Sequence, residues 1–126
     1  MSLEPKAFGQ ESEAVAARFL SQRGYRVVER NYRTARGEID IIAYDGNTLV
    51  FVEVKARRGN AFGEPHWSVD RKKQARLWRL AYHYLHHHRL REQACRFDLV
   101  LIQADRGQPP VIELLQNAFE VKGDRL

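Results

Sequence analysis

The stretch Gly37–Lys55, GEIDIIAYDGNTLVFVEVK, constrains the fold most, because it reads as two apolar strands joined by a tight turn. Gly46-Asn47 suits a two-residue type II′ turn, which favours glycine at its first central position. This turn pairs Asp45 with Thr48. A three-residue loop would shift the strands by one residue and move these side chains to opposite faces.

In the two-residue register, one face of the hairpin carries only apolar side chains: Ile39, Ile41, Ala43, Val50, Val52 and Val54. The other face is apolar near the turn and charged at the open end. There Asp40 lies opposite Glu53, and Glu38 lies opposite Lys55. Both faces are mostly apolar, so we expect two central strands of a sheet.

The charged end of the hairpin brings carboxylates together at separations of roughly 5–7 Å on a mostly buried surface. Like charges at that distance repel, and each loses hydration. A divalent cation such as Mg²⁺ would resolve the conflict, because it prefers hard oxygen ligands. The structural alternative is a cross-strand Glu38–Lys55 ion pair with Asp40 solvated at a strand end.

The composition predicts one domain, residues 1–126, with residues 1–9 and 120–126 loosely ordered. There are 21 Lys and Arg against 16 Asp and Glu, and the sequence pI is about 9.7. This balance favours a polyanionic partner, although a solvated basic surface would look the same. The single cysteine, Cys95, excludes an internal disulfide and fits a reducing cytoplasm. We expect a cytoplasmic protein without a signal peptide or membrane contact, since no apolar run approaches about 20 residues.

Apolar periodicity predicts two helices around the hairpin, over Glu11–Arg23 and Val69–Arg91, the second with Ser68 as N-cap. Further strands are predicted at Tyr25–Arg30, Cys95–Gln103 and Val111–Gln116, the last one at an edge. The order is α-β-β-β-α-β-β. The second helix would be a crossover, which makes the Cys95–Gln103 strand parallel to a central strand. The expected fold is α/β, a mixed sheet of about five strands flanked by helices.

Basic residues gather near the charged end of the hairpin, in the loop Asn31–Arg36, after Lys55 and in the first turns of the second helix. We expect them to hold phosphates, with solvated surface charge as the alternative. Cations at a helix N-terminus oppose the dipole, which an anion would explain. In the glycine-rich stretch Ala56–Trp67, aromatic side chains would either stack on bases or pack the loop onto the body. The candidates are Arg33, Arg36, Arg57, Arg58, Lys72, Lys73 and Arg76 for phosphates, and Phe62, His66 and Trp67 for stacking.

The histidines His83, His86, His87 and His88 lie in the predicted last turns of the second helix. His83 and His87 have a zinc-compatible spacing of four residues. Histidine also complements the dipole at a helix C-terminus, and we favour that structural interpretation.

Asp40 followed by Glu53-Val54-Lys55 resembles the core signature of the PD-(D/E)XK nuclease superfamily. The wording GEIDIIA and LVFVEVKAR is closer still to the bacterial YraN-like family, which looks related to Holliday-junction resolvases. Glu13, Lys73 and Arg96-Phe97-Asp98 match other recurring positions of that family, while Ser12 stands where the family often has glycine. The resemblance spans about residues 8–119 and implies a restriction-endonuclease-like core.

The resemblance implies a Mg²⁺- or Mn²⁺-dependent DNA endonuclease. Asp40, Glu53 and the Val54 carbonyl would hold the metal, Glu13 would complete the shell, and Lys55 would orient the nucleophile or neutralise charge. From the residues alone, we favour the interpretation that Glu13 complements the dipole of its helix. The substrate would be chosen by structure, such as branched or single-stranded DNA, and a resolvase-like reaction would need a homodimer.

Two alternatives remain open at the level of sequence. One is a non-catalytic nucleic-acid-binding module on the same fold. The other is an interaction protein that oligomerises through its edge strand.

Overall fold

The structure is a computed structural model that describes residues 5–58, 70–105 and 107–119. Its elements are α1 (Pro5–Gln22), β1 (Arg26–Thr34), β2 (Gly37–Asp45), β3 (Thr48–Arg58), α2 (Arg71–His87), β4 (Cys95–Ala104) and β5 (Val111–Phe119). The predicted order α-β-β-β-α-β-β and the α/β class are confirmed.

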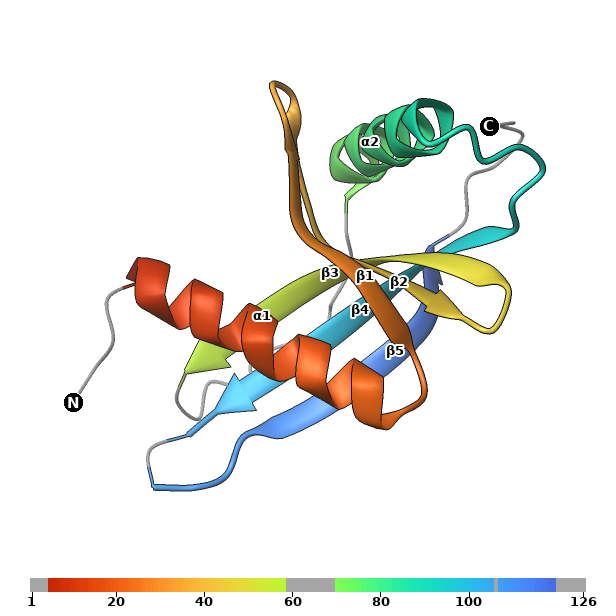
Figure 1. Cartoon of the computed structure of the whole chain (residues 1–126). Coiled ribbons are helices and arrows are strands. Elements are labelled where there is room, and N and C mark those ends of the chain that lie inside the picture. The colour runs from red at the N-terminus through yellow and green to blue at the C-terminus, as the bar shows by residue number, and fades with distance from the viewer. Residues whose placement is uncertain (1–4, 59–69, 106, 120–126) are drawn as a thin grey trace.

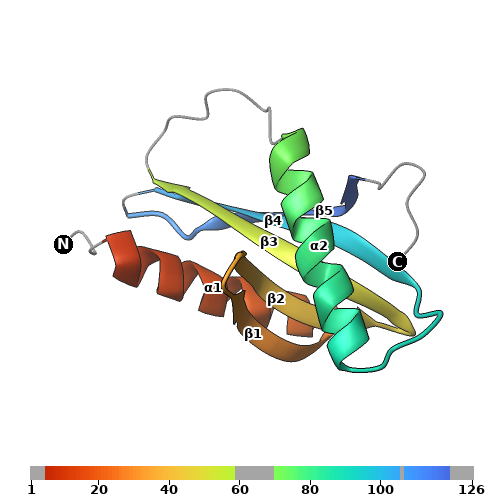
Figure 2. The same cartoon turned by 90° about the horizontal axis from the view of Figure 1, so that it is seen from above.

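The five strands form one mixed sheet in the order β1-β2-β3-β4-β5. Neighbouring strands are antiparallel except β3 and β4, which are parallel because α2 crosses over between them. The predicted parallel crossover and the predicted edge position of β5 are therefore confirmed. The helices α1 and α2 cover opposite faces of the sheet (Figures 1 and 2).

Both helices differ from their predicted bounds. α1 begins at Pro5, six residues before the predicted start, and proline is well suited to a first helical position because it lacks an N–H. α2 begins at Arg71, and Asp70 is its N-cap in place of Ser68: its side chain accepts the N–H of Lys73 at 2.8 Å. The helix ends at His87, before the predicted Arg91, and Arg89 next to its C-terminus has a φ of 56°.

The predicted turn between β2 and β3 is confirmed. Asp45 pairs with Thr48, and the register continues to Ile41 opposite Val52. Gly46 has a φ of 60°, whereas Asn47 does not have a positive φ, as a type II′ turn requires.

Beyond Ile41 the hairpin departs from the predicted geometry. β2 stays paired with β1 up to Gly37 opposite Thr34, but its pairing with β3 ends at Ile41. The β1–β2 hairpin bends out of the sheet toward α2 (Figure 1). As a result, the predicted continuation of the ladder to Asp40–Glu53 and Glu38–Lys55 is wrong.

This bend also changes the environment of Ile39. We expected it on the same face as Ile41 and Ala43, but it lies in the α2-side core with Ile42. The loop predicted over Asn31–Arg36 is mostly strand, because β1 runs to Thr34. A longer β1 gives β2 a partner after it leaves β3.

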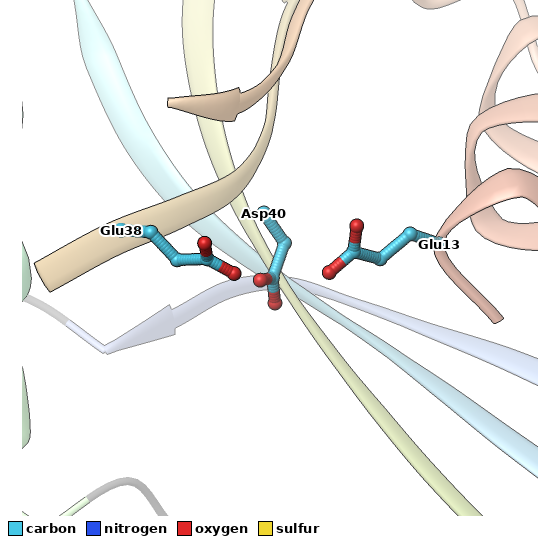
Figure 3. A group of neighbouring side chains, drawn as sticks. All are labelled: Glu13, Glu38 and Asp40. Atoms are coloured by element: carbon cyan, nitrogen blue, oxygen red, sulfur yellow. The ribbon is translucent and has the colours of Figure 1, made fainter. Parts of the chain in front are cut away.

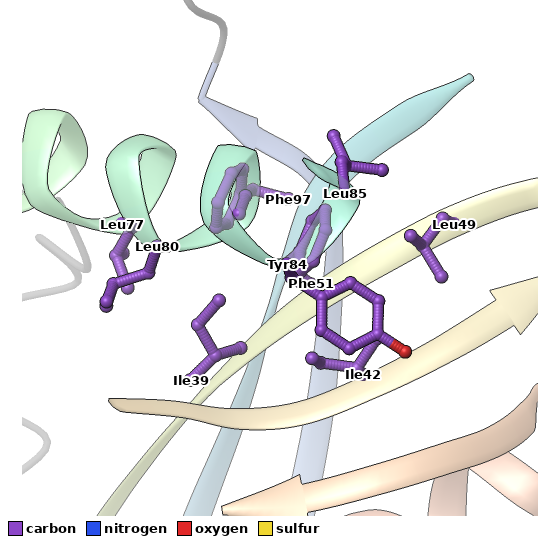
Figure 4. Close-up of a cluster of buried hydrophobic side chains, with 10 residues drawn as sticks. Ile39, Ile42, Leu49, Phe51, Leu77, Leu80, Tyr84, Leu85 and Phe97 are labelled. Atoms are coloured by element: carbon purple, nitrogen blue, oxygen red, sulfur yellow. The ribbon is translucent and has the colours of Figure 1, made fainter. Parts of the chain in front are cut away.

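Two apolar cores hold the helices on the sheet. The α2-side core, shown in Figure 4, contains Ile39, Ile42, Leu49, Phe51, Leu77, Leu80, Ala81, Tyr84, Leu85 and Phe97. The α1-side core contains Ala16, Leu20, Tyr25, Ile41, Ala43, Val50, Val52, Val100 and Ile102. None of the helices in the described part of the chain has the length and hydropathy needed to span a membrane.

Candidate functional site

Asp40 lies at the point where β2 leaves β3. The residue is 9% exposed, and its Oδ2 accepts the Val54 N–H at 2.8 Å. The carboxylate thus takes a backbone donor at the place where the β2–β3 pairing has ended. This side-chain hydrogen bond therefore links β2 to β3 beyond the end of their backbone pairing.

Glu13 of α1 and Glu38 of β2 direct their carboxylates toward Asp40 (Figure 3). One oxygen from each of the three groups lies within 4.8 Å of the others. The helix position of Glu13 and the bend of β2 are both needed for this, so two separate elements build the group. Glu13 therefore faces the site, as the family resemblance implies.

Glu53 of β3 lies beside Asp40 and reaches α2. Its carboxylate, which is largely buried, forms an ion pair with Nζ of the half-buried Lys73. Lys55 contacts Lys73 from the same strand as Glu53. Lys73, predicted to hold phosphate, thus contacts Glu53 within the site.

Burial and crowding change the acid–base behaviour of these groups. Burial, then the charges of Glu53 and Glu13, raise the pKa of Asp40 to about 8, against the lowering effect of the Val54 hydrogen bond. Burial and the neighbouring Glu38 raise the pKa of Glu13. The raised pKa values mean that protons can compensate for the excess of carboxylates when no cation does so.

The pKa values of Lys55 and Lys73 change in opposite directions. Burial and the adjacent Lys73 lower the pKa of Lys55. Burial also disfavours the charged form of Lys73, but the hydrogen bond and charge of Glu53 outweigh it, so the pKa of Lys73 is raised. Lys55 is consequently the more easily deprotonated of the two amines.

The donor atoms here fit a hard divalent cation. Carboxylate oxygens from Glu13, Glu38 and Asp40 converge, and Glu53 adds another beside Asp40. Glu38 was not predicted as a ligand, because the expected register paired it with Lys55. Its actual ion-pair partner is Arg33, through Nε at 2.8 Å. The position of Glu38 two residues before Asp40 was the signal in the sequence. The bend of β2 decides the direction of the Glu38 side chain.

The remaining predicted phosphate contacts lie around the site. Arg33 is on β1 beside Glu38, and Arg36 is exposed in the β1–β2 turn. Arg57 and Arg58 are exposed at the end of β3, and Lys72 is exposed in the first turn of α2. Phe62, His66 and Trp67 lie outside the described residues.

The histidines form a ring-stacked, exposed group at the end of α2. The ring centroids of His83 and His87 are 6.2 Å apart, and His88 stacks on Tyr84 at 4.0 Å. Among the described residues, no further ligand side chain joins them in a metal-binding group of three.

The sequence has clear relatives. The model of the family described as "Uncharacterised protein family UPF0102" matches residues 12–102. A UPF0102 protein of Moorella thermoacetica is 44% identical over 120 residues, covering 94% of this chain and all of the relative. One from Desulfosudis oleivorans is 46% identical over 113 residues, covering 90% and 89% of the two chains. One from Symbiobacterium thermophilum is 47% identical over 111 residues, covering 88% and 94%.

These matches include the residues of the site from Glu13 to Lys73, and they confirm the resemblance drawn from GEIDIIA and LVFVEVKAR. The chain belongs to the UPF0102 family, the family of the YraN-like proteins.

Proposed function

We propose that this protein is a metal-dependent phosphodiesterase that cleaves DNA. The observation that carries the proposal is the position of Asp40: a buried carboxylate on which Glu13 and Glu38 converge and which Glu53 adjoins, with Lys55 and Lys73 close by. Four neighbouring carboxylates destabilise the fold, because each charged group is desolvated and repelled by the others. Protons or a bound cation would offset this cost. Perturbed pKa values of this kind are typical of functional sites.

Asp40, Glu53 and Glu13 would hold Mg²⁺ or Mn²⁺, joined by Glu38 and, as the family resemblance implies, the Val54 carbonyl. Such a cation lowers the pKa of bound water and stabilises charge on the attacked phosphate. The chain's own residues do the rest. The Val54 N–H fixes the rotamer of Asp40, and the ion pair with Lys73 fixes Glu53.

Lys55 and Lys73 bring two amines to the same place from β3 and α2. They supply positive charge for the transition state of a phosphate diester. Because its pKa is lowered, Lys55 is the better candidate to orient the attacking water or to accept a proton from it.

Contacts to the phosphate backbone carry no direct sequence information. The site therefore supports selection by DNA structure, such as branches or single-stranded ends, rather than by base sequence.

The test is a cleavage assay on branched, duplex and single-stranded DNA with Mg²⁺, Mn²⁺ or EDTA. We expect metal-dependent cleavage that falls at least about 100-fold in Asp40→Asn and Lys55→Ala. Glu53→Gln should behave the same way, whereas Glu113→Gln on the exposed edge strand β5 is the matched control.

Cleavage in EDTA, or full activity of Asp40→Asn, would contradict the proposal. Salt-sensitive DNA binding that EDTA leaves unchanged, with no cleavage of any substrate, would favour a non-catalytic binding module instead.

A further inference from the structure

The helix α2 carries the whole excess of positive charge in this protein. Its 17 residues include five Lys and Arg and no Asp or Glu. The other 16 Lys and Arg of the chain are balanced by 16 Asp and Glu, so the net charge of +5 equals the charge of this one helix. Such a concentration on a single element marks a surface for a polyanion.

The orientation of α2 puts this charge on the outside. Leu77, Leu80, Ala81, Tyr84 and Leu85 are buried against the sheet. Residues 71, 72, 76 and 79, all basic, are exposed on the opposite side and are followed by His83, His86 and His87. With about 1.5 Å of rise per residue, neighbouring cations are spaced on the order of 5 Å along the axis, comparable with phosphates along a strand.

The charged face begins at the candidate site. Lys73, in the first turn of α2, contacts Glu53, and Lys72 next to it is exposed. Arg76 lies near the β1–β2 turn, since a Cβ at Gly37 would be 3.7 Å from Arg76 Cδ. The helix therefore extends outward from the site over about 25 Å.

We propose that the exposed face of α2 binds the phosphate backbone of double-stranded DNA and directs it into the carboxylate site. This rests on the proposed function, because it names the partner of that site. Nonspecific grip on single strands depends on aromatic stacking platforms, whereas the exposed residues 71, 72, 76 and 79 of α2 offer cations at a spacing that suits a phosphate backbone. A membrane surface fits less well, because a membrane-bound helix needs an apolar face free and that of α2 is buried.

The experiment measures the affinity of the full chain for a fluorescently labelled 20-base-pair duplex by anisotropy, in EDTA, across a series of KCl concentrations. The test variant is Lys72→Ala with Arg79→Ala, two exposed residues on one side of α2. The control variant, Arg18→Ala with Arg23→Ala, removes the same charge from α1 and the residue that follows it, on the other face of the sheet.

We expect the α2 variant to lose roughly 10- to 100-fold in duplex affinity near 0.1 M salt and to reduce the salt slope by about two. The control should bind as the unaltered protein does. Equal losses in both variants, or no loss in the α2 variant, would overturn the inference. Two other results would also overturn it. One is tighter binding of a single strand than of the duplex, retained in the α2 variant. The other is binding of phosphatidylserine vesicles but not of DNA, also retained in the α2 variant.

Because EDTA removes metal, this result is separate from the proposed function. Duplex binding through α2 without metal-dependent cleavage would leave the inference standing and refute the phosphodiesterase. Metal-dependent cleavage with an α2 variant that binds duplex normally would do the reverse.

Discussion

Asp40 is stabilised in its protonated form by its surroundings. Between about pH 4 and 8 the folded chain holds this proton, whereas the unfolded chain, with an ordinary pKa of 3.8, has released it. Folding therefore takes up a proton in this range, and the raised pKa of Glu13 acts in the same direction.

We predict that the free energy of unfolding of the metal-free protein falls as pH rises from 5 to 8. The slope from Asp40 is at most about 1.4 kcal/mol per pH unit. Asp40→Asn keeps an acceptor for the Val54 N–H but does not titrate, so its stability should change less with pH. Urea unfolding at several pH values, with EDTA present, measures both slopes. Equal slopes in the two proteins would show that Asp40 does not hold the proton.

At this scale, sequence reasoning identified Asp40, Glu53, Lys55 and Glu13 as one candidate group, and the structure brings them together. It did not place Glu38, because the side-chain alternation of an unbroken hairpin pairs Glu38 with Lys55. No residue in GEIDIIA indicates that the pairing with β3 ends at Ile41.

The secondary-structure elements follow local signals where those signals are strong. The Gly46-Asn47 turn and the apolar period of α2 predicted a hairpin and a helix that are both present. The ends of the elements depend on tertiary contacts. β1 extends to Thr34 since it pairs with the part of β2 that leaves β3, and Ile39 faces α2 for the same reason.

An ion pair between Lys73 of α2 and Glu53 of β3 joins the two elements at the site. We predict that Lys73→Ala destabilises the metal-free protein by about 1–3 kcal/mol, because it leaves the buried Glu53 carboxylate without its partner. Adding Mn²⁺ should restore part of this loss, since a bound cation would compensate Glu53.

Lys72→Ala is the matched control for Lys73→Ala. It removes the same side chain one residue away, from an exposed position, and should change stability by less than about 0.5 kcal/mol. Urea unfolding of the two variants makes the comparison. Similar losses in both would mean that the ion pair contributes little.

At the scale of the molecule, a second polar group holds the opposite part of the sheet together. Asp98 on β4 is 1% exposed and accepts from Tyr25 Oη, Arg96 Nε and the Asn117 N–H at 2.8–2.9 Å. Arg96 also reaches Asp45 at the end of β2. Asp98 thus pairs with Arg96, and the network joins four parts of the chain.

We predict that Asp98→Ala lowers the free energy of unfolding by about 2–4 kcal/mol, because it removes the buried acceptor that Tyr25 Oη, Arg96 Nε and the Asn117 N–H share, while Arg96 keeps its ion pair with Asp45. The affinity of the folded protein for Mn²⁺ should not change. Thermal unfolding and a metal titration below the midpoint would measure both. A loss of metal affinity without a loss of stability would assign Asp98 to the site instead.

The most direct test of the account is a calorimetric titration of the unaltered protein and of Asp40→Asn with Mn²⁺ at pH 8. It requires no assumption about the substrate. We expect Mn²⁺ to bind the unaltered protein and not the variant, because Asp40 lies between the other carboxylates. Equal binding by both proteins, or no binding by either even with a short DNA duplex present, would contradict the metal site and the phosphodiesterase built on it.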